Sequence, residues 1–133
     1  MTDFPATHSD LLRPDVKAFA WLATVQPDGS PQVTPVWFDV HEGHVRVNTA
    51  KGRVKNRNMR QNAAVAIAIG DPANPYRYLQ VRGRVVAVTE EGADAHIDSL
   101  AKKYLGADSY PFRRPGEVRV IFTIEPSSFQ AMG

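Results

Sequence analysis

Residues 18–40 have the sequence AFAWLATVQPDGSPQVTPVWFDV, and this stretch decides the fold class. Ala18–Val25 is apolar and ends in β-branched residues, which predicts a buried strand. Gln26–Pro31 predicts a tight turn, because proline presets one turn position, aspartate bonds the backbone and glycine tolerates positive φ. Gln32–Val40 predicts a second strand. Pro35 cannot donate a ladder hydrogen bond, so this strand is expected at an edge, a bulge or a barrel gap.

The remaining segments extend this hairpin into a mainly β fold. A turn at residues 41–44 and a third strand at Val45–Thr49 predict an antiparallel meander of the first three strands. Gly83 predicts a bulge or bend in a long strand. The further predicted strands are Ala63–Gly70, Tyr76–Thr89, Glu117–Ile124 and a short edge at Ser128–Met132.

Two helices are predicted between the strands. Gly52–Asn62 is short and basic, with Val54 and Met59 as its anchors. Glu90–Leu105 is amphipathic and ends at a glycine. Its apolar face is expected to hold Ile97, Leu100, Ala101 and Tyr104.

These elements predict one domain over residues 1–133, a six- to seven-stranded antiparallel β-barrel with two or three short helices. Barrel closure removes the edges that so many apolar strands would otherwise expose. Residues 1–17 predict an irregular lead-in with one helical turn. Residues 1–10 are expected to be flexible or to contact a second subunit.

Composition excludes several classes of protein. Of the 133 residues, 43% are hydrophobic and 23% charged, which excludes a disordered tail, a collagen-like fibre and a coiled coil. No apolar run approaches the roughly 20 residues that a membrane span needs. The first ten residues lack the apolar core of a secretory signal. The chain has no cysteine, hence no disulfide and no thiolate metal site. We expect a cytoplasmic protein.

Charge is concentrated in one window. The net charge is only +2, yet residues 43–70 contain no acidic residue. A focused positive patch attracts an anion better than a dilute one. The basic residues of this window are Arg46, Lys51, Arg53, Lys55, Arg57 and Arg60.

The richest part of this window is Asn48–Asn58, where a strand ends and the basic helix begins. The free N–H groups of a helix start favour an anion, and arginine grips phosphate oxygens in pairs. Helical periodicity places Arg53, Arg57 and Arg60 on one face. The alternative is a solvated basic face balanced by acids elsewhere.

Other candidates carry structural alternatives. Thr34 and Thr49 could be ordinary packing residues, and Tyr76 and Tyr78 could serve core or dimer packing. Three large aromatic residues are expected in the core rather than the site: Trp21, Trp37 and Phe38. The histidines are His8, His41, His44 and His96; they lie in the lead-in, a turn and a helix expected to be exposed, without metal-ligand spacing. No metal site is predicted.

The ordered motifs LATVQPDGSPQVTPVWF, NTAKGRVKNRNM and NPYRYLQVRGRV resemble the pyridoxamine-phosphate-oxidase-like split-barrel flavoproteins. The closer similarity is to the actinobacterial branch that binds the deazaflavin coenzyme F420. The resemblance runs from about residue 9 to residue 125. It implies an FMN-binding-type split barrel and a homodimer with two cofactors between the subunits.

The resemblance also implies site residues. Lys55, Arg57 and Asn58 match the cofactor-phosphate motif, and Arg53 belongs to the same clamp. The end of the third strand lies behind the tricyclic ring of the cofactor, and the second strand runs along that ring. The two tyrosines come from the partner subunit. The expected cofactor-binding residues are Gln32, Thr34, Pro35, Val36, Asn48, Thr49, Ala50, Lys51, Arg53, Lys55, Arg57, Asn58, Tyr76 and Tyr78.

The implied activity is hydride transfer between reduced F420 and a small conjugated or electron-poor substrate. The cofactor carries the difficult chemistry, so no catalytic residue is identified; the proton would come from solvent or a tyrosine. FMN is the rival cofactor, and a non-catalytic carrier or sensor is the rival role. An oligoglutamate tail on F420 would favour extra basic residues, with candidates Arg77, Arg82, Arg84, Arg113 and Arg114. No nucleic-acid partner is predicted, since exposed aromatics do not alternate with the basic residues.

Overall fold

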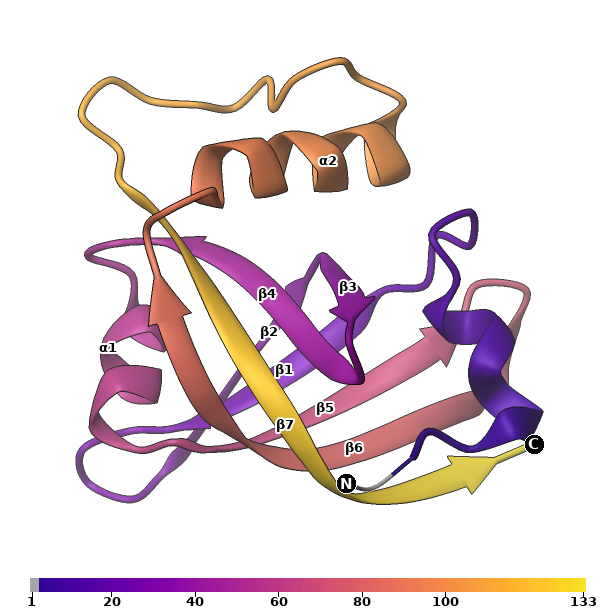
Figure 1. The fold of residues 1–133 in the computed structure, drawn as a ribbon. Helices are drawn as coiled ribbons and strands as arrows, with labels where there is room; N and C mark the ends of the chain where they lie inside the picture. Colours follow the sequence, from indigo (N-terminus) through magenta and orange to yellow (C-terminus); the bar gives the residue numbers. More distant parts are fainter. Residues whose placement is uncertain (1–2) are drawn as a thin grey trace.

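The computed structural model describes residues 3–133, within which seven strands form one curled antiparallel sheet (Figure 1). The strand order is β2-β1-β5-β6-β7-β4-β3. This confirms the mainly β split barrel. The strands are β1 (Ala20–Val25), β2 (Pro31–Val36), β3 (Phe38–His41), β4 (His44–Ala50), β5 (Ala64–Asp71), β6 (Asn74–Thr89) and β7 (Arg119–Met132). The helices are the 3-10 helix η1 (Ala6–Leu12), α1 (Val54–Gln61) and α2 (Ala93–Leu105).

The prediction of one strand over Gln32–Val40 in a three-stranded meander is wrong. The chain breaks at Trp37, and the two parts lie at opposite ends of the sheet order as β2 and β3. Within residues 3–133, β2 pairs only with β1 and β3 pairs only with β4. Pro31 and Pro35 leave β2 two donors short, which suits an edge strand. The barrel is therefore split where the chain steps from one edge to the other.

The core lies on the concave face of this sheet. Leu22, Ile67, Leu79 and Phe122 from four different strands are completely or almost completely buried there. Phe38 is buried as predicted. The prediction fails for Trp21, which is 47% exposed because it alternates with Leu22 onto the outer face.

The predicted bulge at Gly83 is confirmed. The β6–β7 register shifts between Arg82 and Gly83, and Gly83 faces Pro126. A Cβ at Gly83 would collide with the carbonyl oxygen of Glu125, so only glycine allows the two backbones this close. The predicted separate strands Glu117–Ile124 and Ser128–Met132 are one strand, because the bulge accommodates Pro126 within β7.

The helices lie around the sheet, with α1 and η1 at opposite ends of it and α2 beside β4 (Figure 1). The predicted apolar face of α2 is buried. The helix begins at Ala93 rather than Glu90, since Gly92 precedes it with φ of 76°. In the lead-in, Leu11 is buried and Asp10 pairs with Arg77 at 2.7 Å. None of the helices in the described part of the chain is long and apolar enough to cross a membrane.

Candidate functional site

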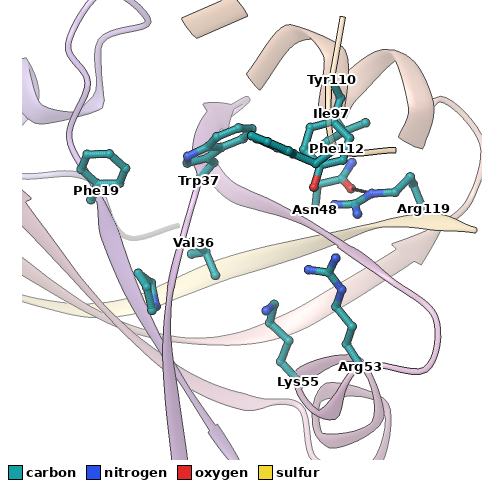
Figure 2. A pocket seen from close by; sticks show the side chains of 11 residues that line it. Phe19, Val36, Trp37, Asn48, Arg53, Lys55, Ile97, Tyr110, Phe112 and Arg119 are labelled. Carbon is teal, nitrogen blue, oxygen red and sulfur yellow. Dashed lines mark hydrogen bonds between the residues drawn. The ribbon is translucent and has the colours of Figure 1, made fainter. Parts of the chain in front are cut away.

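A pocket of about 290 Å³ lies where the β2–β3 junction, the end of β4 and the start of α1 meet the segment between α2 and β7 (Figure 2). Its cationic lining residues are Arg53, Lys55 and Arg119. Its aromatic lining residues are Phe19, Trp37, Tyr110 and Phe112. The others are Pro35, Val36, Asn48 and Ile97. None of these lining residues is acidic, so the pocket offers positive charge on one side and aromatic surface on another.

Two of the three cations, Arg53 and Arg119, share one carboxylate. Glu117 lies 3.0 Å from Nη1 of Arg119 and 4.0 Å from Nη2 of Arg53. Burial lowers the pKa of Lys55, and the positive charges of Arg53 and Arg119 lower it further. An anion in the pocket would relieve this repulsion, and the arrangement therefore suits a phosphate or carboxylate ligand.

Asn48 holds Arg119 in place. Its Oδ1 accepts a hydrogen bond from Arg119 Nε at 2.9 Å, and its Nδ2 donates to the Ala93 carbonyl at 2.9 Å. Nδ2 also lies 3.0 Å from Nδ1 of His96. The expected exposure of His96 is wrong: its side chain is buried, because the α2 face that carries it packs against β4.

A second polar chain anchors α1 beneath the pocket. Arg57 donates to Asn58 at 3.4 Å, Asn58 donates to Thr24 at 3.0 Å, and Thr24 donates to Gln32 at 2.8 Å. Gln32, Arg57 and Asn58 are thus connected, although none of the three lines the pocket. Asn58 is completely buried, so its amide serves this connection.

The predicted helix anchors are half right. Met59 is buried as expected, whereas Val54 is 46% exposed. Asn56 takes the place of Val54: it is buried and donates to the Ala50 carbonyl at 3.2 Å. Arg60 donates to Asn56 at 2.6 Å and does not line the pocket.

Two predicted ring contacts are chemically open. The hydroxyls of Thr34 and Thr49 are buried, and within residues 3–133 neither has a hydrogen-bond partner. Buried polar groups normally have one. Neither threonine lines the pocket, and Thr49 is completely buried, so a bound group would reach these hydroxyls only after a local rearrangement. A phosphate would suit Arg53 and Lys55, which do line the pocket. The residues present therefore fit a flavin-type phosphorylated cofactor.

The remaining predicted residues lie elsewhere. Lys51 is exposed and pairs with Glu90 at 2.7 Å. Tyr76 is 83% exposed, and Tyr78 faces Gly70 across the β5–β6 pair. Neither tyrosine lines the pocket of its own chain.

The arginines that were candidates for binding the oligoglutamate tail of F420 fall into two groups. Arg77 is held by Asp10 and Asp71, and Arg113 by Asp94 and Asp98. These two are already paired within the chain. Arg82, Arg84 and Arg114 are exposed. The described residues contain no group of three or more His, Asp or Glu side chains that could hold a metal ion.

The sequence reasoning missed much of the aromatic side and Arg119. Trp37 was expected in the core, but it stands at the break between β2 and β3 and stacks on Tyr104 with centroids 5.4 Å apart. Tyr110 and Phe112 come from the irregular segment before β7, which gave no signal. The signal for Arg119 was a charge at the start of an otherwise apolar strand.

The profile of the family described as pyridoxamine 5'-phosphate oxidase matches residues 12–133. The chain belongs to the pyridoxamine 5'-phosphate oxidase family. A solved protein described as an F420 reductase is similar, with a TM-score of 0.82 and 36% identity over 96% of this chain and 98% of that one. This agrees with the family resemblance seen in the sequence motifs.

Two solved structures of lower sequence identity share the fold. A conserved hypothetical protein from Mycobacterium tuberculosis has a TM-score of 0.73 and 19% identity, over 97% of this chain and 84% of that one. General stress protein 26 from Bacillus anthracis has a TM-score of 0.65 and 17% identity, over 94% of each chain. No curated protein is significantly similar to this chain.

Proposed function

We propose that this family member is an F420-dependent oxidoreductase that transfers a hydride between the reduced deazaflavin and a small conjugated or electron-poor substrate. The observation that carries the proposal is the cationic side of the pocket, which is lined by Arg53, Lys55 and Arg119, and where the carboxylate of Glu117 lies near the two arginines. Similarity to a solved F420 reductase over nearly the full length of both chains favours F420 over FMN.

The chain's own residues would bind and orient the cofactor. Arg53 and Lys55 would hold the phosphate through charge-assisted hydrogen bonds. The ring would lie on the apolar surface of Val36, and the unpartnered hydroxyls of Thr34 and Thr49, buried beyond the pocket lining, would meet its polar edges only after a local rearrangement. When bound, the deazaflavin supplies the hydride chemistry, and the protein supplies position and a dry environment.

The aromatic side of the pocket suits the substrate. Trp37, Tyr110 and Phe112 form a continuous series of ring contacts, with centroids 6.1 and 5.7 Å apart. Such a surface stacks on planar conjugated molecules. Tyr104 is unsuited to give a proton, since burial raises its pKa to about 12 and its hydroxyl donates to the Ala18 carbonyl. The proton would come from solvent or Tyr110.

We also propose a homodimer formed through the outer face of the sheet. Trp21 is paired in register with Pro35 on one side and Ala68 on the other. Val33, beside Ala23, is 60% exposed. An exposed apolar patch of this kind marks a protein interface. Pairing of two copies here would also cover Tyr78, which continues this face on β6.

A side-by-side titration tests the cofactor. Purified protein is titrated with F420 and with FMN, and binding is followed by fluorescence. Tighter binding of F420 is expected. Tighter binding of FMN would move the protein to the FMN-dependent alternative, and binding of neither would refute the proposal.

A turnover assay tests the activity. Reduced F420 is mixed with the protein and a panel of enones and quinones, and its oxidation is followed by absorbance. Loss of reduced F420 above the protein-free rate supports the reductase. F420 binding without turnover across the panel would favour the carrier or sensor.

A further inference from the structure

A buried polar relay runs from β3 to β7 behind the pocket. Nε2 of His96 lies 3.2 Å from Oδ2 of Asp39, and Nδ1 of His96 lies 3.0 Å from Nδ2 of Asn48. Asn48 in turn accepts from Arg119. The side chains of His96 and Arg119 are each 3% exposed, so solvent does not compete for these contacts. Arg119 is the member of the relay that charges the pocket.

The two fixed bonds of Asn48 determine the proton positions on His96. The donor Arg119 Nε requires the amide oxygen on its side, and the acceptor Ala93 O requires the amide nitrogen on the other. Nδ2 of Asn48 therefore points a hydrogen at Nδ1 of His96, which must accept it. The imidazole then carries its single proton on Nε2, which lies 3.2 Å from Oδ2 of Asp39 without meeting the geometry of a hydrogen bond in this structure.

The carboxylate that faces this imidazole is already paired with a cation. Asp39 is held by Arg46 through two contacts of 2.9 and 2.7 Å, so its negative charge is already compensated. Lys103 of the same helix donates to the Phe38 carbonyl next to Asp39. A second proton, on Nδ1, would face the amide hydrogens of Asn48 and break the relay.

From this geometry we infer that His96 is a positioning residue for the pocket. As the neutral Nε2–H tautomer it fixes the amide of Asn48, and Asn48 fixes the Arg119 guanidinium at the pocket wall. The link from Arg119 to ligand binding rests on the proposed function. The tautomer and the orientation of Arg119 do not, because both exist in the ligand-free protein.

The first test reads the protons directly. Nitrogen-detected NMR of the ligand-free, ¹⁵N-labelled protein at neutral pH distinguishes a protonated ring nitrogen from a bare one. We expect a protonated Nε2 and a bare Nδ1 on His96. A protonated Nδ1, alone or together with Nε2, would overturn the inference. This measurement needs no variant.

The second test compares two variants in which His96 is replaced by amide side chains of different length. His96→Asn can place an oxygen near the former Nδ1 and keep the acceptor for Asn48. His96→Gln reaches the former Nε2 and keeps the Asp39 contact, but lacks that acceptor. Asparagine is the smaller residue, so a role in packing alone predicts that His96→Asn is the more damaging change.

The readout is hydrogen exchange of Arg119 Nε–H in the ligand-free protein. We expect roughly tenfold faster exchange in His96→Gln and near wild-type exchange in His96→Asn, because only the former frees Asn48. Equal exchange in both variants, or faster exchange in His96→Asn, would overturn the inference. Affinity for inorganic phosphate should be weakened in His96→Gln and close to the wild-type value in His96→Asn. Failure of F420 to bind would count against the proposed function and leave these exchange rates as they are.

Discussion

Asn58 and Thr24 join helix α1 to strand β1 through one buried hydrogen bond of 3.0 Å between the Asn58 amide and the Thr24 hydroxyl. The exposed fractions are 0% for Asn58 and 1% for Thr24. The Thr24 hydroxyl in turn donates a hydrogen bond to Oε1 of Gln32 in β2. The helix that carries the basic residues is therefore held by polar contacts from below, and its orientation depends on them.

We expect Asn58→Leu to lower the free energy of unfolding by about 1–3 kcal/mol, because it removes a buried bond and leaves the Thr24 hydroxyl without its donor. Urea unfolding measures the change. Gln61→Ala, at an exposed position of the same helix, is the control and should stay within about 0.5 kcal/mol of wild type. An equal effect of both variants would show that the bond contributes nothing specific.

Lys55 and Arg57 should differ in cofactor binding, although both belong to the sequence motif. Lys55 lines the pocket and Arg57 does not. Lys55→Met should weaken F420 binding by about 1.5–3 kcal/mol, the typical value of a bond to a charged group, and Arg57→Gln should weaken it less. Calorimetric titration measures both affinities.

Lys102→Gln is the control for net charge, since Lys102 is exposed and does not line the pocket. It should leave the affinity unchanged. A larger loss in Arg57→Gln than in Lys55→Met would contradict the assignment of Lys55 to the pocket wall.

Gly83→Ala should destabilise the protein more than Gly70→Ala. A Cβ at Gly83 would meet the Glu125 backbone oxygen, which cannot move without opening the β6–β7 pair. At Gly70 the new atom would meet the far edge of the Trp21 ring at 3.3 Å, and a side chain can adjust. We expect a loss of about 1–3 kcal/mol at Gly83. Thermal or urea unfolding of both variants measures the two losses. A larger loss in Gly70→Ala than in Gly83→Ala would contradict the prediction.

Asp39 should make stability depend on acid pH. Burial alone would raise its pKa, but contacts with His96 and Arg46 outweigh burial and lower the pKa to about 2 from the usual 3.8. A lowered pKa in the folded state means that the stabilisation is complete above about pH 4 and is lost as the pH falls towards 2. Its size is about 2 kcal/mol.

The measurement is the difference in unfolding free energy between wild type and Asp39→Asn across this pH range. The difference should be largest at pH 5 and should shrink as the pH falls towards 2. A difference that stays constant from pH 5 to pH 2 would contradict the lowered pKa.

Trp21→Glu should convert the proposed dimer into monomers, since it places a charge on the outer sheet face beside Pro35 and Ala68. Analytical ultracentrifugation measures the change. Leu105→Glu is the matched control, because Leu105 is 48% exposed at the end of α2, outside that face. A wild-type protein that sediments as a monomer would contradict the proposed dimer itself.

Local sequence was enough to predict most elements of the fold. Turn residues, alternation and the glycine at position 83 predicted the strands and the bulge, because each depends on a few neighbouring residues. The basic entrance to α1 was visible for the same reason: Arg53 and Lys55 are close in sequence and stay close in space.

The separation of β2 from β3 and the composition of the pocket were decided by the tertiary structure alone. One residue, Trp37, divides a stretch whose pattern is continuous, and only the closing of the sheet sends its two parts to opposite edges. Asn48, His96 and Arg119 lie on β4, α2 and β7, and their hydrogen bonds exist only after those elements pack. Spacing along the chain holds no information on such contacts, since they depend on where the barrel brings distant segments together.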